Sequence, residues 1–465
     1  MASYILNRNY RLRGFKELPF GIMHPNRTDT DFFDKEQYSV ILDCDGNTDI
    51  DLSLITDKQK EVLETLLKLG FIRECEKGEK LQPEQEYVLY PSNNKSRVQW
   101  SITGRCNMRC RHCFLSAPDY TGDDAPLIDC IRVLDQLQEC GISAVGITGG
   151  EPLVHKDLYR IVEEISKRGM ILESIYTNCL LVNDELLDKL ESLHQRPAFN
   201  ISFDGVGCHD WLRGIDGMEQ ITIDAIKLLK KRDYFVGAAM SLHRNNVSSI
   251  RETVKLLGEL GCDHLKASGM IYTGNWLNEK DCYITDAELY DCLLEYIPQY
   301  FEDGMPVSMQ IGLLLEYDKL SGTARIPAVH GTGDESTANK PACGVVKRSL
   351  YIGADGKVLP CMSFAGNPID IDFDSVYDKP LYEIINDSHY ATLANATCAQ
   401  CVEHNKECME CKYKWLCRAG CRAGACDNNK TDYYGIDENA CAFFKGGYFE
   451  KVQKIIEETE GKLLE

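Results

Sequence analysis

The sequence lacks the features that would place a chain in a membrane or along a nucleic acid. It has no run of about 18 apolar residues, and its first residues lack the apolar core of a signal peptide. Basic residues are in deficit, because 51 Lys and Arg face 72 Asp and Glu and leave a formal charge of −21. Such a charge opposes binding to a phosphate backbone. We therefore expect a cytoplasmic protein of two or three domains that binds neither nucleic acid nor membrane.

Cysteine is abundant instead, with 22 residues in the chain of 465. In a cytoplasmic protein so many thiols indicate metal binding rather than a disulfide framework. The most informative group is Cys106, Cys110 and Cys113, on a short segment after the apolar, strand-like stretch 98–103. Three thiolates on one loop can hold three irons of a [4Fe–4S] cluster and leave the fourth iron open. A zinc knuckle is the alternative, although zinc usually takes four protein ligands in paired C-x2-C units.

A second motif lies about 35 residues downstream, where an apolar stretch ends in Gly149, Gly150, Glu151 and Pro152. Glycines permit close approach of another backbone, and a carboxylate attracts an ammonium group. Together with the C-x3-C-x2-C spacing, this turn resembles that of the radical SAM enzymes. The resemblance implies that the three cysteines hold a [4Fe–4S] cluster and that the turn receives the amino group of S-adenosylmethionine.

Seven further cysteines in the C-terminal part of the chain, from Cys343 to Cys441, form a third pattern. Their spacing is C-x12-G-x4-C, then C-x2-C-x5-C-x3-C, then a last cysteine. This spacing resembles the SPASM domain, the C-terminal extension of subtilosin, pyrroloquinoline quinone, sulfatase and mycofactocin maturases. The resemblance implies two auxiliary [4Fe–4S] clusters, one held by Cys408, Cys411, Cys417 and Cys441, and one held by Cys343, Cys361 and Cys421.

The second auxiliary set leaves one iron without an assigned ligand. Some relatives have another cysteine six residues after the first, but here that residue is Ser349. The extra cysteines Cys398, Cys401 and Cys426 could supply the ligand, or the open iron could bind a substrate thiolate. A pair of zinc ribbons is the competing interpretation, because Cys398 and Cys401 form one C-x2-C unit and a second follows. The zinc interpretation gives no role to Cys343, Cys361 and Cys441, three of the seven cysteines of the SPASM-like pattern.

Further cofactor contacts are implied at strand ends and in the cysteine loop. Asn178 follows one apolar stretch, and the segments around Ser202 and Arg213 resemble the Ser-x-Asp-Gly and His-Asp-x-x-Arg segments of SPASM relatives. There the serine and the arginine bind the ribose and the carboxylate of the cofactor, and an arginine fork suits a carboxylate. The resemblance also places His112 against the adenine, with a solvent-facing loop histidine as the alternative. The expected S-adenosylmethionine contacts are thus His112, Gly149, Gly150, Glu151, Pro152, Asn178, Ser202 and Arg213.

Apolar strands alternate with amphipathic helices between the two cysteine-rich regions. Such βα units predict an α/β fold with a parallel sheet and chemistry at the carboxyl ends of its strands. The radical SAM resemblance implies a partial (β/α)6 barrel. The expected strands are 143–148, 171–177, 198–203, 235–242 and 264–267, and the expected helices are 157–167, 184–193, 218–231 and 248–260.

The first 95 residues form a separate unit. Strand-like stretches occur around Tyr4–Leu12 and Phe32–Phe33, and residues 56–72 form an amphipathic helix that Gly70 closes. With the turn at residues 42–46, this pattern resembles a PqqD-like winged-helix domain. In peptide-modifying enzymes that domain binds the leader of a precursor peptide as an added edge strand. A cap that packs on the barrel is the alternative.

Four parts are therefore expected. They are a leader-binding, winged-helix-like domain at 1–95, a radical SAM barrel at 96–325, a SPASM domain at 340–445 and a C-terminal helix at 446–465. The resemblance implies an oxidoreductase that uses S-adenosylmethionine and three [4Fe–4S] clusters to generate a 5′-deoxyadenosyl radical. Its product would be a thioether or carbon–carbon cross-link in a ribosomally synthesised precursor peptide. A reducing partner such as flavodoxin or ferredoxin is expected.

Two other functions compete with this one. A sulfatase-type maturase would form formylglycine, but in that family an aspartate follows the second SPASM cysteine, whereas here Met362 follows Cys361. A non-catalytic iron–sulfur module for electron transfer is the other. The intact Gly-Gly-Glu-Pro turn opposes it, because such a module needs no pocket for S-adenosylmethionine.

Overall fold

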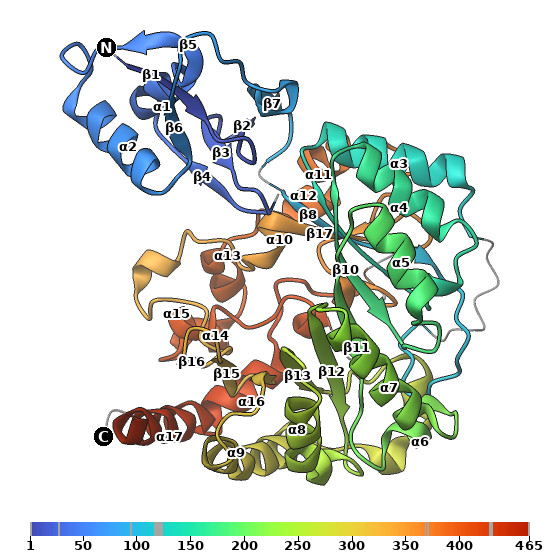
Figure 1. Ribbon diagram of the computed structural model, residues 1–465. Helices are drawn as coiled ribbons and strands as arrows, with labels where there is room; N and C mark the ends of the chain where they lie inside the picture. The colour runs from blue at the N-terminus through green and yellow to red at the C-terminus, as the bar shows by residue number, and fades with distance from the viewer. Residues whose placement is uncertain are drawn as a thin grey trace.

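One sheet of 11 strands organises the molecule (Figure 1). The computed structural model describes residues 2–26, 28–93, 95–115, 124–367, 369, 372–426 and 431–463. Eight neighbouring strands of the sheet are parallel, in the order β17 (Ser349–Ile352), β8 (Arg97–Thr103), β9 (Ala144–Gly149), β10 (Ile171–Thr177), β11 (Ala198–Ser202), β12 (Val236–Leu242), β13 (His264–Gly269) and β14 (Ser308–Ile311). Antiparallel strands extend it at both ends, namely β15 (Leu315–Asp318), β16 (Thr323–Arg325) and β18 (Val358–Leu359).

A long helix separates each of the strands β8 to β13 from the next strand. Figure 1 shows these helices around the outer side of the sheet, and each buries an apolar stripe, as Ile161, Val162 and Ile165 do on α4. The helices are α3 (Leu127–Glu139), α4 (Leu158–Lys167), α5 (Asp184–Ser192), α7 (Met218–Lys231), α8 (Ile250–Glu259) and α9 (Asp286–Glu302).

The α/β fold with six βα units is thus confirmed, and the sheet is longer than expected. After α9, β14 continues the parallel run at one edge. At the other edge β17 joins from beyond the predicted barrel and pairs with β8, with Ser349 opposite Arg97 and Ile352 opposite Trp100. The C-terminal part therefore contributes strands to the barrel sheet, and one hydrophobic core runs from Val98 to Val452.

The N-terminal part contains two small sheets and a hydrophobic core of its own. The first sheet, in the order β5-β1-β6, comprises β1 (Ala2–Leu6), β5 (Asp45–Ile50) and β6 (Ile72–Cys75). The second, in the order β4-β3-β2-β7, comprises β2 (Arg11–Phe15), β3 (Gly21–Met23), β4 (Thr30–Phe32) and β7 (Val88–Tyr90).

Two helices pack in this N-terminal part, α1 (Lys35–Leu42) and α2 (Asp57–Lys68). Each begins at a capping box, with Asp34 and Thr56 as the N-cap residues, which satisfies the first backbone N–H groups. The amphipathic helix expected after residue 56 is α2. The stretch expected as one strand around Tyr4–Leu12 is two strands, because the chain turns between β1 and β2. The part is richer in strand than the sequence pattern suggested.

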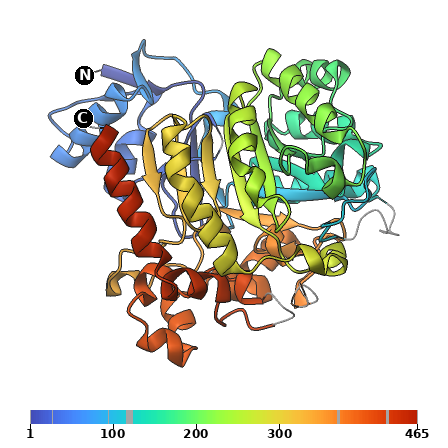
Figure 2. The ribbon, with the colours of Figure 1, turned by 90° about the horizontal axis from the view of Figure 1, so that it is seen from below.

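Short helices make up most of the C-terminal part. They are α10 (Val345–Arg348), α11 (Leu381–Asp387), α12 (His389–Ala394), α13 (Cys398–Glu403), α14 (Lys406–Glu410), α15 (Lys414–Cys417) and α16 (Glu438–Lys445). The last helix, α17 (Tyr448–Leu463), packs beside α9, where Tyr448 Oη donates to Asp291 Oδ1 at 2.9 Å (Figure 2). In the part of the chain that the structure describes, no helix is long and apolar enough to cross a membrane.

Candidate active site and cysteine sites

The loop after β8 carries Cys106, Cys110 and Cys113 and is held from outside the loop. Asn275 donates from Nδ2 to the carbonyl of Cys110 at 3.2 Å and from its backbone N–H to the carbonyl of Cys113 at 3.0 Å. Burial raises the pKa of the Cys106 thiol to about 11, and the nearby thiols of Cys110 and Cys113 add to the effect. A thiol whose pKa is raised in this way needs a bound cation to become a thiolate, which suits an iron–sulfur site.

The turn after β9 packs directly on this cysteine loop. Gly150 donates from its N–H to the carbonyl of Thr103 at 2.9 Å. A methyl group at Gly149 would lie 2.2 Å from the Thr103 oxygen, and one at Gly150 would lie 2.2 Å from the Arg105 oxygen. Gly149 also has φ +151°, which side chains disfavour. The two glycines therefore allow the turn, which ends at the buried Pro152, to lie against the loop.

Glu151 joins the ends of β9 and β10 rather than standing open in the site. Its buried carboxylate accepts hydrogen bonds from the Thr177 hydroxyl at 2.9 Å, the Asn178 N–H at 2.8 Å and the Leu153 N–H at 3.0 Å. Burial raises its pKa to about 7 despite these donors. Asn178 continues the connection, because its Nδ2 donates to Asn107 Oδ1 in the cysteine loop at 2.7 Å.

A buried ion pair lies beneath the same loop. Arg213 binds Asp204 Oδ2 through Nε and Nη2, both at 2.7 Å, and its Nη1 donates to the sulfur of Cys110 at 3.7 Å. Burial alone would raise the pKa of Asp204, but Arg213 and a hydrogen bond from His209 hold it well below its usual range. Arg213 thus links a buried carboxylate to one of the loop cysteines, and its contact with the cofactor carboxylate stays a prediction.

His112 and Ser202 complete the set of expected contacts. Among the described residues, buried His112 Nδ1 has no hydrogen-bond partner. Burial, followed by the charge of Arg213, lowers the pKa of His112 to about 3, so the ring is neutral. A neutral ring with an unsatisfied nitrogen beside the cysteine loop fits a polar cofactor. Ser202 ends β11 opposite Ala239 of β12.

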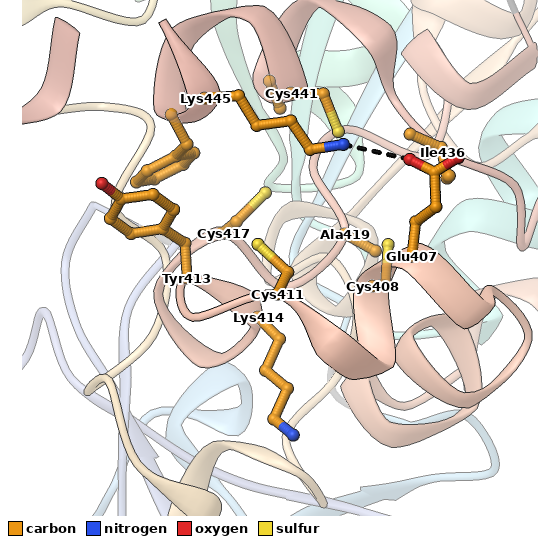
Figure 3. A pocket seen from close by; sticks show the side chains of 12 residues that line it. Glu407, Cys408, Cys411, Tyr413, Lys414, Cys417, Ala419, Ile436, Cys441 and Lys445 are labelled. Atoms are coloured by element: carbon orange, nitrogen blue, oxygen red, sulfur yellow. Dashed lines mark hydrogen bonds and ion pairs between the residues drawn. The ribbon is translucent and has the colours of Figure 1, made fainter. Parts of the chain in front are cut away.

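Four C-terminal cysteines line one small pocket. In Figure 3 the sulfurs of Cys408, Cys411, Cys417 and Cys441 point toward the same space. Burial, and then the thiols of Cys441, Cys408 and Cys411 with Asp437, raises the pKa of Cys417 to about 12. These four residues come from α14, α15, α16 and the segment between α14 and α15.

Cys343, Cys361 and Cys421 form the second group. Burial, and then the neighbouring thiols of Cys421 and Cys343, raises the pKa of Cys361 to about 12. Burial likewise raises the pKa of Cys421, with Cys343 among its neighbours. Ser349 begins β17 opposite Arg97.

A left-handed turn separates the two groups where the chain passes from one to the other. Arg418, Ala419 and Gly420 have φ values of +57°, +62° and +78°. Two consecutive residues with side chains in this region are unusual and need support from their surroundings. The turn lies between Cys417 and Cys421, which belong to different cysteine groups.

The extra cysteines lie beside this turn. Cys398 accepts a hydrogen bond at its sulfur from Arg418 Nε at 2.9 Å and donates to the carbonyl of Lys340 at 3.1 Å. Burial raises the pKa of Cys401, which the nearby Arg422 opposes. Cys426 is buried, and its carbonyl accepts from Asn367 Nδ2 at 2.7 Å. Cys398 therefore already has hydrogen-bond partners within the protein.

This arrangement bears on the choice between zinc and iron–sulfur clusters. Over the described ranges, no three His, Cys, Asp or Glu side chains are placed to hold a single metal ion. A tetrahedral zinc ion would bring its sulfur ligands within about 3.8 Å of one another. In a four-iron cluster each thiolate binds a different iron, so wider separations are expected. The assignment of the cysteine groups to clusters stays a prediction.

Sequence reasoning missed the residues that support these sites. Asp204, Asn107, Arg418 and Arg422 were not among the expected site residues. Arg418 and Arg422 flank Cys421, and both side chains are buried. The sequence signal for their role was their position, because Arg418 lies three residues before Cys421 and Arg422 directly after it. An arginine that becomes buried at such a place usually has specific partners.

The fold and the three cysteine groups define a class of protein. The family model of the radical SAM superfamily matches residues 100–257, and that of the SPASM iron–sulfur cluster-binding domain matches residues 343–412. The chain is a radical SAM enzyme with a C-terminal SPASM domain. Its cofactors are accordingly S-adenosylmethionine and [4Fe–4S] clusters.

Among characterised proteins the chain is similar to several enzymes. It is 27% identical to the antilisterial bacteriocin subtilosin biosynthesis protein AlbA of Bacillus subtilis, over 77% of this chain and 73% of AlbA. It is 24% identical to the AdoMet-dependent heme synthase of Methanosarcina barkeri, over 77% and 99%. It is 26% identical to the PqqA peptide cyclase of Bradyrhizobium diazoefficiens, over 60% and 69%.

Solved structures of one protein match almost the whole chain. Streptococcus suis SuiB bound to its precursor peptide SuiA superposes with a TM-score of 0.66 at 14% identity, over 94% of this chain and 99% of SuiB. The residues after position 95 make up only about four fifths of the chain. The shared fold therefore extends into the N-terminal part.

Proposed function

We propose that this enzyme is a peptide maturase that installs an oxidative cross-link, a thioether or a carbon–carbon bond, in a ribosomally synthesised precursor peptide. The fold similarity to SuiB, which reaches beyond the barrel and the SPASM domain into the N-terminal part, carries this proposal. The names of AlbA and PqqA peptide cyclase also refer to peptide-derived products, which supports it. The heme synthases are the competing group of relatives, and a peptide assay separates the two.

The cysteine loop and the expected cofactor contacts would have different roles in the reaction. Bound S-adenosylmethionine, when reduced, supplies a 5′-deoxyadenosyl radical that removes a hydrogen atom from the substrate. Cys106, Cys110 and Cys113 would hold the cluster that binds it. His112, Gly149, Gly150, Glu151, Pro152, Asn178, Ser202 and Arg213 would shape the pocket and exclude water, which keeps the target C–H bond close to the radical carbon.

The two auxiliary cysteine groups suit an oxidation. A cross-link between two side chains removes electrons from the peptide, so the enzyme needs an acceptor near the bound substrate. Cys408, Cys411, Cys417 and Cys441 would hold one auxiliary cluster, and Cys343, Cys361 and Cys421 would hold the other. A cytoplasmic reductant such as flavodoxin or ferredoxin would supply the electron that starts each turnover.

The N-terminal part would recognise the leader of the precursor. Strands β5 and β6 border its first sheet, and β4 and β7 border its second. The unpaired backbone groups of an edge strand can form hydrogen bonds with an extended peptide. These bonds give an affinity that depends little on the sequence of the peptide. Binding should therefore depend on the alternation of apolar residues in the leader more than on one charge.

A sulfatase-type maturase has less support. Met362 takes the place of the aspartate expected after the second SPASM cysteine, and its sulfur accepts a hydrogen bond from Gln99 Nε2 at 3.5 Å. A residue without an acid–base group in that place cannot serve as a proton acceptor. A purely electron-transferring module has less support still, because the Gly-Gly-Glu-Pro turn resembles the S-adenosylmethionine-binding turn of radical SAM enzymes, which such a module does not need.

The test uses anaerobically reconstituted protein and a short precursor peptide encoded beside its gene. We expect about twelve irons per chain if all three clusters have four irons. We also expect a peptide product lighter by two hydrogens for each cross-link. About four irons with stoichiometric zinc, or no change in the peptide while a tetrapyrrole is converted, would overturn the proposal.

The leader-binding role is tested by removing residues 1–95. The truncated enzyme should still cleave S-adenosylmethionine without coupling but should leave the precursor unmodified. The isolated leader, labelled and titrated against the full chain, should bind saturably. Full modification by the truncated enzyme, with no leader binding, would leave the N-terminal part as a structural cap.

A further inference from the structure

The hydroxyl of Tyr390, like those of the buried Tyr234 and Tyr296, has no hydrogen-bond partner among the described residues, and of the three Tyr390 is the most deeply buried. Tyr390 lies on α12 with 0% of its surface exposed, and its Oη is unsatisfied. Buried hydroxyl groups are almost always hydrogen-bonded, and an unmade bond costs about 1–3 kcal/mol. Such a hydroxyl therefore indicates a partner that the protein chain itself does not provide.

The surroundings of Tyr390 place it beside the second auxiliary cysteine group. Burial, and then the thiols of Cys361 and Cys343, raises the pKa of its hydroxyl. The Lys95 Nζ lies 5.1 Å from the centre of its ring and 2.6 Å from the carbonyl of Val346, three residues after Cys343. These contacts join α12 to the segment that carries Cys343.

A backbone contact supports this placement. The N–H of Ala342 donates to the carbonyl of Ala396 at 2.8 Å, which ties the segment after α12 to the residue before Cys343. Tyr390 therefore lies next to the segment that carries Cys343, which Lys95 and the backbone bond of Ala342 both connect to the region of α12.

A neighbouring tyrosine provides the contrast. Tyr433 is also buried, and its pKa is raised by burial and then by Cys343, with Cys361 contributing. Its hydroxyl, however, donates to the carbonyl of Leu393 at 3.0 Å. Of these two buried tyrosines beside the same cysteines, one has its hydrogen bond and the other does not.

We propose that Tyr390 donates its hydroxyl hydrogen bond to a sulfur of the auxiliary cluster held by Cys343, Cys361 and Cys421. The raised pKa keeps the hydroxyl protonated, so it acts as a donor and not as a phenolate ligand. A hydrogen bond to a cluster sulfur stabilises the reduced, more negative state and raises the reduction potential. Tyr390 is thus a positioning residue that tunes this cluster as an electron acceptor.

This inference rests on the cluster assignment made above but not on the peptide substrate. The experiment compares the reconstituted full chain with its Tyr390→Phe and Tyr433→Phe variants in redox titrations followed by electron paramagnetic resonance. Tyr390→Phe should move one midpoint potential to a more negative value without loss of iron. Tyr433→Phe should leave every potential unchanged, because its hydroxyl already has a backbone partner.

Two outcomes would overturn the proposal. Unchanged potentials in Tyr390→Phe would show that the hydroxyl does not reach the cluster. Loss of iron or the appearance of a three-iron signal would make Tyr390 a ligand instead.

A second substitution applies if Tyr390→Phe fails to fold. It is 3-fluorotyrosine placed only at position 390, which keeps the shape of the ring and donates a stronger hydrogen bond. The potential should then become more positive, and no shift or the opposite shift would overturn the inference. None of these readouts needs a peptide, so failed peptide modification would count against the proposed function alone.

Discussion

Arg418 donates a hydrogen bond from Nε to the sulfur of Cys398 at 2.9 Å, across 20 residues of sequence. Arg418 is also the first residue of the left-handed turn between Cys417 and Cys421, and its Nη1 donates to the carbonyl of His330 at 2.9 Å. The pair fixes the guanidinium on both sides and so supports a backbone conformation that would otherwise be strained. Cys398 thus has a role in the structure as a partner of Arg418.

The first prediction concerns this pair. Cys398→Ala should leave the buried guanidinium with one partner fewer and lower the free energy of unfolding by about 1–3 kcal/mol. Cys398→Ser keeps an acceptor and should restore most of that loss. Both variants should keep the full iron content, whereas Cys417→Ala should not. Iron analysis and anaerobic thermal unfolding decide, and loss of about four irons in Cys398→Ser would instead make Cys398 a ligand.

The second prediction concerns the loop after β8. Changing Cys106, Cys110 and Cys113 to Ala together should abolish formation of 5′-deoxyadenosine and leave about eight irons on the auxiliary clusters. The reason is that these thiols would hold the cluster whose open iron binds S-adenosylmethionine. Iron and sulfide analysis with a deoxyadenosine assay makes the measurement. An undiminished yield from the triple variant would contradict the assignment.

The third prediction concerns the close contact between the glycine turn and the cysteine loop. Gly150→Ala would place a methyl group 2.2 Å from the Arg105 oxygen and force the loop to move. A displacement of about 1 Å can slow a reaction about 100-fold, so we expect a loss of that order in 5′-deoxyadenosine formation. Gly344→Ala, beside Cys343 but with nothing within 4 Å of the added methyl, is the matched control. Equal rates in the two variants would refute the steric argument.

The fourth prediction concerns the buried ion pair. Asp204→Asn removes the charge that compensates Arg213 and should lower the free energy of unfolding by about 3–5 kcal/mol. Asp216→Asn, at an exposed position nearby, should change it by no more than about 0.5 kcal/mol. Anaerobic denaturant titrations of the reconstituted proteins provide the comparison. Similar small effects in both variants would mean that the pair contributes little.

The fifth prediction concerns pH. Burial, and then the charge of Lys347, lowers the pKa of Lys95 from 10.5 to about 7. Between these two values the unfolded chain binds more protons at this residue than the folded one, so stability should rise with pH across that window. The contribution approaches about 1.4 kcal/mol per pH unit. Lys95→Met should flatten the rise, and Lys406→Met, at an exposed residue, should not. Equal slopes in the two variants would contradict the shift.

The barrel could be predicted from the sequence because its signals are local. Each βα unit shows an apolar run followed by a helical stripe, as in β10 and α5, and these patterns survive in the fold. The pairing of β17 with β8 could not be predicted, since a strand of four residues has little signal and its partner lies far away in the chain. The strand β5, with the sequence DGNTDI, has almost no apolar pattern and is formed through its pairing with β1.

The candidate site also has some features that the sequence predicts and others that it does not. The cysteine groups and the glycine turn follow from spacing, because a cluster loop needs ligands at set intervals. The contacts of Asp204 with Arg213 and of Arg418 with Cys398 could not be predicted, because each depends on how distant segments pack. The expected role of Glu151 illustrates the difference. Its place in the turn follows from the sequence, but its hydrogen bonds from Thr177 and Asn178 follow only from the meeting of β9 and β10.

The pairing of β8 with β17 has a consequence for how the enzyme is made. A ribosome that adds 5–20 residues per second needs roughly 12–50 s to pass from the end of β8 to the end of β17. Throughout that time the outer backbone edge of β8 stays unpaired, and the cysteine loop that follows it is already outside the ribosome. A strand with an unpaired backbone edge can associate with other chains, and exposed thiols can be oxidised. Synthesis at low temperature under anaerobic conditions, with iron supplied before the chain is complete, should therefore raise the yield of intact enzyme.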